Sequence, residues 1–484
     1  MRRRPTAAAD NPALCHANVL GQPEGAPVSA DPGGRARAAR LAEVARRLRA
    51  LGGWCLWAGL AAWAASAQAV SMFRGDATHR GQMAADAQLP SMVKGVKWSF
   101  ATGDRIMSSP VWHAGAVFFG SDDGHVYSLD ADSGRLRWSW RTGGPVPSTP
   151  AVHEGRLYVT SYDGRLHALD AASGAPLWTF ATEGERRFEA RGLHGAQPRR
   201  QTLADPFDVF LSSPVVAQGL VVFGSGDGHV YALDAASGAL RWKHRTGDVV
   251  HASPAVAEGR VYVGSWDGRF YALDLASGEQ RWVVQTGLDP LMHNQQGFQS
   301  SPAVADGVVY VGCRDSHLYA FDARTGAERW RFPTGASWVV SSPAVVQGRV
   351  IFGTSDSSLL HIVDAATGKP LAQVDARSYL FSSPSVVGEQ FVIGVLNGSL
   401  QAHDLATGAE RWRWQTGAAQ RNAGWALTAE GRLNSPWIYS SSWRESMALG
   451  FARQTAIGAI FSTPLVVGRV VYVGSSDGRL YAIE

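Results

Sequence analysis

Three short segments of the chain carry residue types that do chemistry in other proteins. Residues 474–478, GSSDG, match the G-x-S-x-G pattern in which a serine on a strand-to-helix turn is a nucleophile. Residues 224–228, GSGDG, have the glycine content of a phosphate-binding loop. Residues 130–134, DADSG, are similar to the start of a calcium loop. The zinc and haem patterns HExxH, CxxC and CxxCH do not occur in the sequence.

Each of these segments lacks the element that its chemistry needs. A nucleophile elbow and a phosphate loop both lead into a helix, whereas residues 479–483 and 229–233 have the pattern of a strand. The segment 130–134 is not followed by the distal Glu that completes a calcium loop. The sequence therefore predicts that all three segments are turns of a β structure.

The three segments belong to a repeat that occurs eight times. Each copy starts with Ser or Thr followed by Pro, has a Gly ten residues later and an Asp after ten more. The second copy has Thr160 in place of Gly, the sixth needs eleven residues to reach Asp364, and the eighth ends at Glu484. The eight prolines are Pro110, Pro150, Pro214, Pro254, Pro302, Pro343, Pro384 and Pro464.

Each copy has the pattern of four short antiparallel strands. In the fourth copy, Val261–Val263 and Arg269–Leu273 flank the dipeptide Asp267-Gly268, a strong hairpin signal because both residues tolerate positive φ. A second turn then leads to a strand that contains Trp282. Four strands in about 40 residues are typical of a propeller blade. The fold class that we predict is all-β, an eight-bladed β-propeller of four-stranded antiparallel blades, in residues 93–484.

The two ends of the repeat region indicate how the ring closes. The eighth copy stops after its third strand, while Trp98 lies in a strand-like segment that precedes every copy. Trp98 precedes Pro110 by twelve residues, as Trp138 precedes Pro150. We therefore expect an N-terminal strand to complete the eighth blade and to remove a free sheet edge.

Most copies fit the pattern A-x-D-x-x-x-G-x-x-x-W, although the sixth copy has Ala372 where Trp is expected. This pattern resembles the tryptophan-docking repeat of the PQQ-type eight-bladed propellers. Phe73-Arg74-Gly75 and His79 resemble the lead-in segment of secreted members, which we place at residues 70–92. The resemblance implies structural docking roles for Trp98, Trp138, Trp178, Trp242, Trp282, Trp330 and Trp412.

The resemblance points to two functional branches. Quinoprotein dehydrogenases hold PQQ and calcium on the propeller axis, use an Asp base and typically carry two adjacent cysteines. BamB-type outer-membrane protein assembly factors are non-enzymatic and bind other proteins. Cys313 is the only cysteine after residue 69, and no calcium ligand, catalytic Asp or lipidation cysteine can be carried over. We therefore expect a protein-binding scaffold without a cofactor, and PQQ with calcium only under the alternative, a PQQ-dependent dehydrogenase.

Residues 1–69 have the features of a leader with a secretory signal peptide. An Arg-rich stretch precedes the twelve-residue apolar run Trp54–Ala65, and Ala67-Gln68-Ala69 provides a cleavage site. Twelve residues are too few to span a bilayer, so we expect a periplasmic or secreted chain without a transmembrane span after cleavage. Residues 70–484 hold 36 basic and 37 acidic residues, a balance that argues against nucleic-acid binding.

Three insertions interrupt the repeat, each between a blade's outer strand and the next Pro. The distance from Asp to Pro is 44 residues after Asp170, 28 after Asp274 and 60 after Asp404, against 20 in the shortest copies. These connections share a face with the Asp-Gly hairpins, and loops on one face of a rigid scaffold often bind partners. Alternatively, the insertions only pack on one another and plug the axial funnel. The candidate partner-binding residues are Arg186, Arg187, His194, His293, Asn294, Trp425, Trp437, Trp443 and Arg444.

Overall fold

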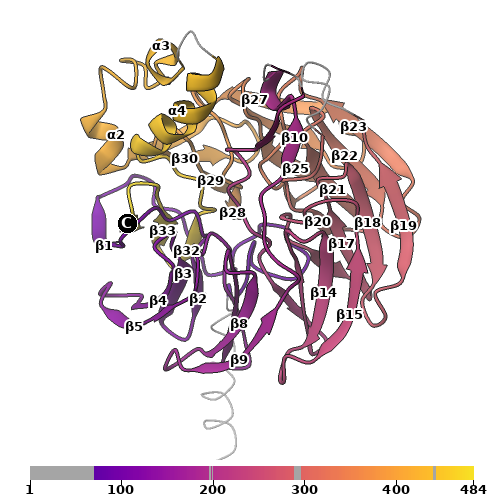
Figure 1. The fold of residues 1–484 in the computed structure, drawn as a ribbon. Helices are drawn as coiled ribbons and strands as arrows, with labels where there is room; N and C mark the ends of the chain where they lie inside the picture. The colour runs from indigo at the N-terminus through magenta and orange to yellow at the C-terminus, as the bar shows by residue number, and fades with distance from the viewer. Residues whose placement is uncertain (1–69, 196–197, 199, 288–295, 440–442) are drawn as a thin grey trace, which may run out of the picture. The chain divides into compact units, whose positions relative to one another are not determined.

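The computed structural model describes residues 70–195, 198, 200–287, 296–439 and 443–484. Within these residues, four-stranded antiparallel sheets follow one another around an axis as eight blades (Figure 1). The predicted eight-bladed β-propeller is thus confirmed. The predicted signal peptide lies outside the described residues. None of the helices in the described part of the chain is long and apolar enough to cross a membrane.

Blades 1 to 4 each contain four consecutive strands, from the innermost to the outermost. Blade 1 has β2 (Val111–His113), β3 (Ala116–Gly120), β4 (His125–Asp130) and β5 (Leu136–Arg141); blade 2 has β6 (Ala151–His153), β7 (Arg156–Ser161), β8 (Arg165–Asp170) and β9 (Pro176–Ala181). Blade 3 has β12 (Val215–Ala217), β13 (Leu220–Gly224), β14 (His229–Asp234) and β15 (Leu240–Arg245); blade 4 has β16 (Ala255–Ala257), β17 (Arg260–Gly264), β18 (Arg269–Asp274) and β19 (Gln280–Gln285).

Blades 5 to 7 repeat this order, and blade 8 is completed by β1 (Val96–Ala101). Blade 5 has β20 (Ala303–Ala305), β21 (Val308–Cys313), β22 (His317–Asp322) and β23 (Glu328–Pro333); blade 6 has β24 (Ala344–Val346), β25 (Arg349–Gly353), β26 (Leu359–Asp364) and β27 (Pro370–Asp375). Blade 7 has β28 (Ser385–Val387), β29 (Gln390–Gly394), β30 (Ser399–Asp404) and β31 (Glu410–Gln415); blade 8 has β32 (Leu465–Val467), β33 (Val470–Gly474) and β34 (Arg479–Ile483).

The pairing of β1 with β34 closes the ring, as the sequence predicted. The two strands are antiparallel, with Trp98 opposite Ala482 and Phe100 opposite Leu480. Strands β1, β34, β33 and β32 form one sheet in that order. The first and the last strand of the propeller therefore hydrogen-bond to each other, and blade 8 has four strands like the other blades.

The propeller has two faces with different connections. The connection face carries the Asp-Gly hairpins between the second and third strands, together with the links from blade to blade. The turn face carries the short turns between the first and second strands and between the third and fourth. On the connection face, the hairpin Asp267 accepts hydrogen bonds from the Tyr271 hydroxyl at 2.5 Å and from the backbone N–H of Gly247 at 2.8 Å. The hairpin aspartates thus tie a blade to its neighbour.

The repeated tryptophans lie between successive blades near the turn face. The indole of Trp242 in blade 3 donates to the Leu275 carbonyl of blade 4 at 2.9 Å. The ring covers Gly278, where an added Cβ would lie 2.6 Å from the indole. Trp412 in blade 7 instead donates to Pro90 in the lead-in segment at 2.7 Å, because blade 8 ends before the corresponding turn.

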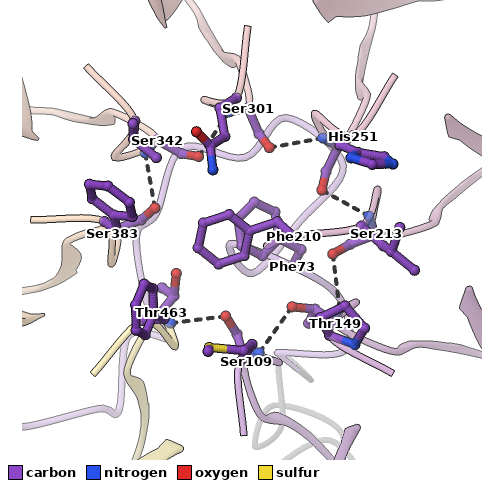
Figure 2. A pocket seen from close by; sticks show the side chains of 18 residues that line it. Phe73, Ser109, Thr149, Phe210, Ser213, His251, Ser301, Ser342, Ser383 and Thr463 are labelled. Atoms are coloured by element: carbon purple, nitrogen blue, oxygen red, sulfur yellow. Dashed lines mark hydrogen bonds between the residues drawn. The ribbon is translucent and has the colours of Figure 1, made fainter. Parts of the chain in front are cut away.

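The Ser and Thr residues of the Ser/Thr-Pro steps form a ring around the propeller axis (Figure 2). The backbone N–H of one blade donates to the hydroxyl of the next; Ser213, for example, donates to Ser253 at 2.9 Å. Among the described residues, six such contacts join blades 1 to 7 in order, and a seventh, from Thr463 to Ser109, links blade 8 to blade 1. This ring gives the repeated hydroxyl a structural role at the axis.

The lead-in segment, residues 70–92, runs past the innermost strands. Its carbonyls accept hydrogen bonds from the inner strands of blades 1, 2, 4, 5, 6 and 7 in chain order, at 2.6 to 2.9 Å. The buried Arg74 donates to the Pro343 and Pro384 carbonyls at 2.7 Å each. Burial lowers the pKa of Arg74 to about 9 and that of His79 to about 3. The segment therefore satisfies strand edges that would otherwise face the axis.

Candidate functional site

Insertion 1, residues 183–210, and insertion 3, residues 418–457, meet over the connection face. Insertion 1 contains the hairpin of β10 (Glu189–Arg191) and β11 (Thr202–Ala204), and insertion 3 contains most of α2 (Gly417–Arg421), α3 (Ser435–Ile438) and α4 (Trp443–Ala456). Figure 1 shows β10 and these helices on the same side of the blades. Phe207 and Phe451 join the two insertions, with ring centroids 5.8 Å apart. We call the two insertions together the cap.

The sequence analysis predicted loops and missed the helices of insertion 3. Thr416 begins α2 with a side chain that accepts a hydrogen bond from the Ala419 N–H at 3.2 Å. Ala419, Leu427, Ile438 and Ile457 then form a small apolar cluster between the helices. Because these apolar residues are spread over about 40 positions, their common face exists only after the helices pack.

A buried arginine fastens insertion 1 to blade 5. The guanidinium of Arg314 lies 3.8 Å from the ring centre of Trp338 and 4.7 Å from that of Trp266. It also donates to Asp205 of insertion 1 at 2.5 Å, and His194 bonds to the same carboxylate at 3.0 Å. Burial opposes ionisation of Asp205, but Arg314 and His194 outweigh it and hold its pKa below the usual value. This group is therefore an ion pair in the protein interior.

A second buried ion cluster lies beside the axis. His251, which precedes a Ser-Pro step, bonds to Asp208 at 2.7 Å and to Glu185 at 2.9 Å, both in insertion 1. Burial alone would lower the pKa of His251, but the two carboxylates raise it to about 10. His251 is therefore a cation at neutral pH, and its charge fixes insertion 1 to blade 4.

The axis below the cap contains a small cavity of about 40 Å³. Phe73 of the lead-in segment and Phe210 of insertion 1 lie at the centre of the Ser/Thr ring, as Figure 2 shows. A single water needs about 10–15 Å³, so this space suits a few waters and is too small for a fused-ring quinone. Among the described residues, no group of three or more His, Cys, Asp and Glu side chains could hold a metal ion.

A second cavity, of about 110 Å³, opens on the connection face over blades 1 and 2. Arg105 and Asp122 contribute from blade 1 and its preceding link, Tyr162 from blade 2, Arg187 from insertion 1 and Phe451 from insertion 3. The guanidinium of Arg105 lies 3.1 Å from the carboxylate of Asp122. Burial raises the pKa of Asp122 to about 6, although Arg105 opposes this shift. This cavity, which we call the blade 1–2 pocket, combines charged groups with apolar walls.

The structure distributes the predicted partner-binding residues unevenly. Arg186 and Arg187 are exposed on insertion 1, and Trp425 is 48 % exposed on insertion 3. Trp437 is half-buried and packs edge-on against Trp425 at 4.6 Å. The prediction for His194 is wrong, because this residue is 5 % exposed and belongs to the buried Asp205 cluster.

Four other predicted residues cannot be placed as side chains. His293 and Asn294 lie outside the described residues. Trp443 and Arg444 lie in α4, but their side chains are also outside the described part of the structure. Their place on a partner-binding face stays a prediction.

The sequence analysis missed one set of residues that the fold brings together. The position just before the Asp of each hairpin between the second and third strands (Asn in the seventh copy) varies from copy to copy, and in most blades it contacts the cap. The residues are Asp122, Tyr162, Gly226, Trp266, Arg314, Ser355, Leu396 and Ser476. Variability at one position of an otherwise regular repeat was the available signal, because a purely structural position would hold one residue type.

Comparisons with known proteins agree with this architecture. The family described as outer membrane protein assembly factor BamB matches residues 84–208, 195–299 and 291–484. No curated protein matches the chain.

Solved structures with a similar fold come from both functional branches. BamB from Moraxella catarrhalis is 18 % identical with a TM-score of 0.58, over 80 % of this chain and 99 % of that one. A europium-containing methanol dehydrogenase is 14 % identical with a TM-score of 0.62, over 87 % and 98 %. The quinohemoprotein alcohol dehydrogenase from Comamonas testosteroni is 14 % identical with a TM-score of 0.59, over 86 % and 80 %. At these identities the solved structures show a shared fold only. The family model, in contrast, matches most of the chain, and the chain therefore belongs to the family of the outer membrane protein assembly factor BamB.

Proposed function

We propose that this chain is a non-enzymatic scaffold that binds protein partners through its connection face, in the manner of BamB-type outer-membrane protein assembly factors. The observation that carries the proposal is the filling of the axis. Phe73 and the cap, Phe210 included, leave a cavity of about 40 Å³ on the propeller axis, where the resemblance to the dehydrogenase branch would place a cofactor. A scaffold needs only a rigid body and an accessible face, and this chain has both.

The buried charges support the same proposal. A charged group that acts on a substrate must be reached by it, and such groups in enzymes lie in clefts. Here Arg314, Asp205, Asp208 and His251 are 2 % exposed or less, and they bond to one another across the boundary between cap and blades. These ion pairs join the cap to the blades, although Nε and Nη2 of Arg314 are buried without a hydrogen-bond partner among the described residues.

The site of action that we propose is the periplasm or the cell exterior. The apolar run that ends before Ala67-Gln68-Ala69 supports export, and the described body has Cys313 as a single buried cysteine. The partners that we propose are proteins such as those of the cell envelope.

Site-specific photo-crosslinking in the native host tests the proposal. A photoreactive residue replaces Trp425, which is 48 % exposed on the connection face, and a matched one replaces Leu240, which is 46 % exposed at the turn-face end of β15. We expect discrete protein adducts, identified by mass spectrometry, from position 425 and none of the same adducts from position 240. The same adducts from both positions would contradict recognition through the connection face.

A second measurement tests the dehydrogenase alternative. A ligand that binds only the native state stabilises it by about 2.7 kcal/mol at a hundredfold excess over its Kd. We expect PQQ with calcium to leave the thermal midpoint of the purified protein unchanged, because the axial cavity is too small. Saturable PQQ binding with dye-linked turnover of an alcohol or sugar would place the chain with the dehydrogenases.

A further inference from the structure

We infer that the blade 1–2 pocket binds a carboxylate group of a partner polypeptide and that Arg187 forms the ion pair with it. The inference rests on the proposed scaffold function and names the chemistry that the connection face recognises. Three observations support the inference: the shape of the pocket, the way its charged groups are paired, and the different surroundings of the adjacent residues Arg186 and Arg187.

The pocket has the size and the walls for a short acidic group. Its volume of about 110 Å³ exceeds by several times the 10–15 Å³ or so that a water requires. Met107, Pro145, Val209 and Phe451 give it apolar walls. Such walls lower the local dielectric constant and so strengthen an ion pair that forms beside them.

The two arginines of the pocket differ in how their charges are balanced. Arg105 lies 3.1 Å from Asp122 and 3.7 Å from Asp104, so two carboxylates compensate its charge. The Arg187 guanidinium lies over the Tyr162 ring, 5.8 Å from its centre, and no carboxylate among the described residues forms an ion pair with it. A guanidinium presents a planar fork of donors that suits a carboxylate, and the cation–π contact with Tyr162 favours its position beside the pocket.

Arg186 supplies the contrast within the same insertion. Its guanidinium pairs with Asp248 of the link between blades 3 and 4 at 2.7 Å. Arg186 thus fastens insertion 1 to the blades, whereas Arg187, the next residue, borders the pocket. Adjacent residues of the same type with different surroundings provide a matched pair for mutation.

Asp122 makes carboxylate binding depend on pH. The charged groups that face Asp122 are Arg105 and Asp104 from the preceding link and Arg187 from insertion 1, and burial raises the pKa of Asp122 to about 6. Below that pH, Asp122 becomes neutral, which removes a negative charge from the pocket and frees the donors of Arg105. A carboxylate ligand should therefore bind more tightly at pH 5.5 than at pH 7.5. The gain in affinity should be about what one additional ion pair contributes.

Binding of small probes to the purified chain, measured by calorimetry or ligand-observed NMR, tests the inference. N-acetyl-aspartate N-methylamide presents a side-chain carboxylate, N-acetyl-leucine presents a chain-terminal carboxylate, and N-acetyl-asparagine N-methylamide is the uncharged control. We expect one or both acids to bind and the asparagine derivative not to bind. The tighter acid identifies the source of the carboxylate.

Two variants assign the ion pair. We expect Arg187→Gln to weaken binding of the acid about tenfold or more, since charge-assisted hydrogen bonds are lost, and Arg186→Gln to change it less than about twofold. We expect Asp122→Asn to bind at pH 7.5 as the parent binds at pH 5.5. An unchanged thermal midpoint of Arg187→Gln shows that the exposed substitution leaves the fold intact.

Two results would overturn the inference: no binding of either acid, or an equal loss in the two arginine variants. These outcomes are separable from failure of the scaffold proposal. Protein adducts from position 425 without carboxylate binding would refute the pocket and keep the scaffold. Carboxylate binding by Arg187 in a protein that forms no adducts would support the pocket chemistry and count against the scaffold.

Discussion

The docking of tryptophan on glycine between blades can be measured with one pair of substitutions in blade 4. Gly278 has φ of +72° and lies beneath the Trp242 ring, where an added Cβ would be 2.6 Å from the indole. Gly259 has the same φ of +72°, and nothing lies within 4 Å of its added Cβ. Gly259→Ala therefore introduces only backbone strain, while Gly278→Ala adds a collision with the ring.

The two effects have different expected magnitudes. Alanine in a left-handed conformation costs about 1–2 kcal/mol at either position. At Gly278 the indole must also move, which strains the packing by about 1–3 kcal/mol and weakens a hydrogen bond to Leu275 that contributes about 0.5–1.5 kcal/mol. We expect Gly278→Ala to lower the free energy of unfolding by about 1–3 kcal/mol more than Gly259→Ala.

Urea unfolding followed by tryptophan fluorescence measures this difference. The difference in midpoint, at an unchanged m-value, reports the difference in stability. If the two variants lose the same stability, the ring contributes nothing specific to the contact between blades 3 and 4. The docking role of the other repeated tryptophans would then also be in doubt.

Two further predictions concern the axis. Because the pKa of His251 is raised from 6.5 to about 10, its stabilisation is complete below pH 6.5 and is lost as the pH rises to 10. The free energy of unfolding, measured in urea, should therefore fall by upward of about 1 kcal/mol over that range in the parent, and this fall should be absent in His251→Gln. Arg74→Met should lower the free energy of unfolding by about 2 kcal/mol or more, because two short hydrogen bonds to buried carbonyls are lost. Arg80→Met is the control: its side chain is 46 % exposed, and the substitution should change the free energy of unfolding by less than about 0.5 kcal/mol. Equal effects of the two arginine substitutions on the thermal midpoint would contradict an anchoring role for Arg74.

Most of the propeller could be predicted because its information is local and repeated. The Ser/Thr-Pro step, the Asp-Gly hairpin and the Trp strand recur within about 40 residues, and each specifies a turn or a strand by its own backbone preferences. The surplus strand at Trp98 and the missing strand after Glu484 were enough to predict the closure that β1 and β34 make.

The cap could not be predicted in the same way, because its contacts join residues that are far apart in the sequence. Asp205 and Arg314 are 109 positions apart, and no sequence pattern around either residue predicts that it contacts the other. His194 was assigned to the surface because Arg and Glu residues surround it in the sequence. Asp205 and Phe207 of the same insertion contact it, and so does Trp338 from the link between blades 5 and 6.

The sequence by itself determined the number of blades, their strands, the place where the ring closes and the face that carries the insertions. The tertiary structure alone decided which side chains meet on that face. Ring closure brings eight hairpin positions to one axis, where Arg314 becomes buried between two tryptophans and Asp122 and Tyr162 come to border an open pocket. The physical reason is that backbone turns depend on neighbours in the chain, whereas burial and charge pairing depend on every residue that reaches the same place.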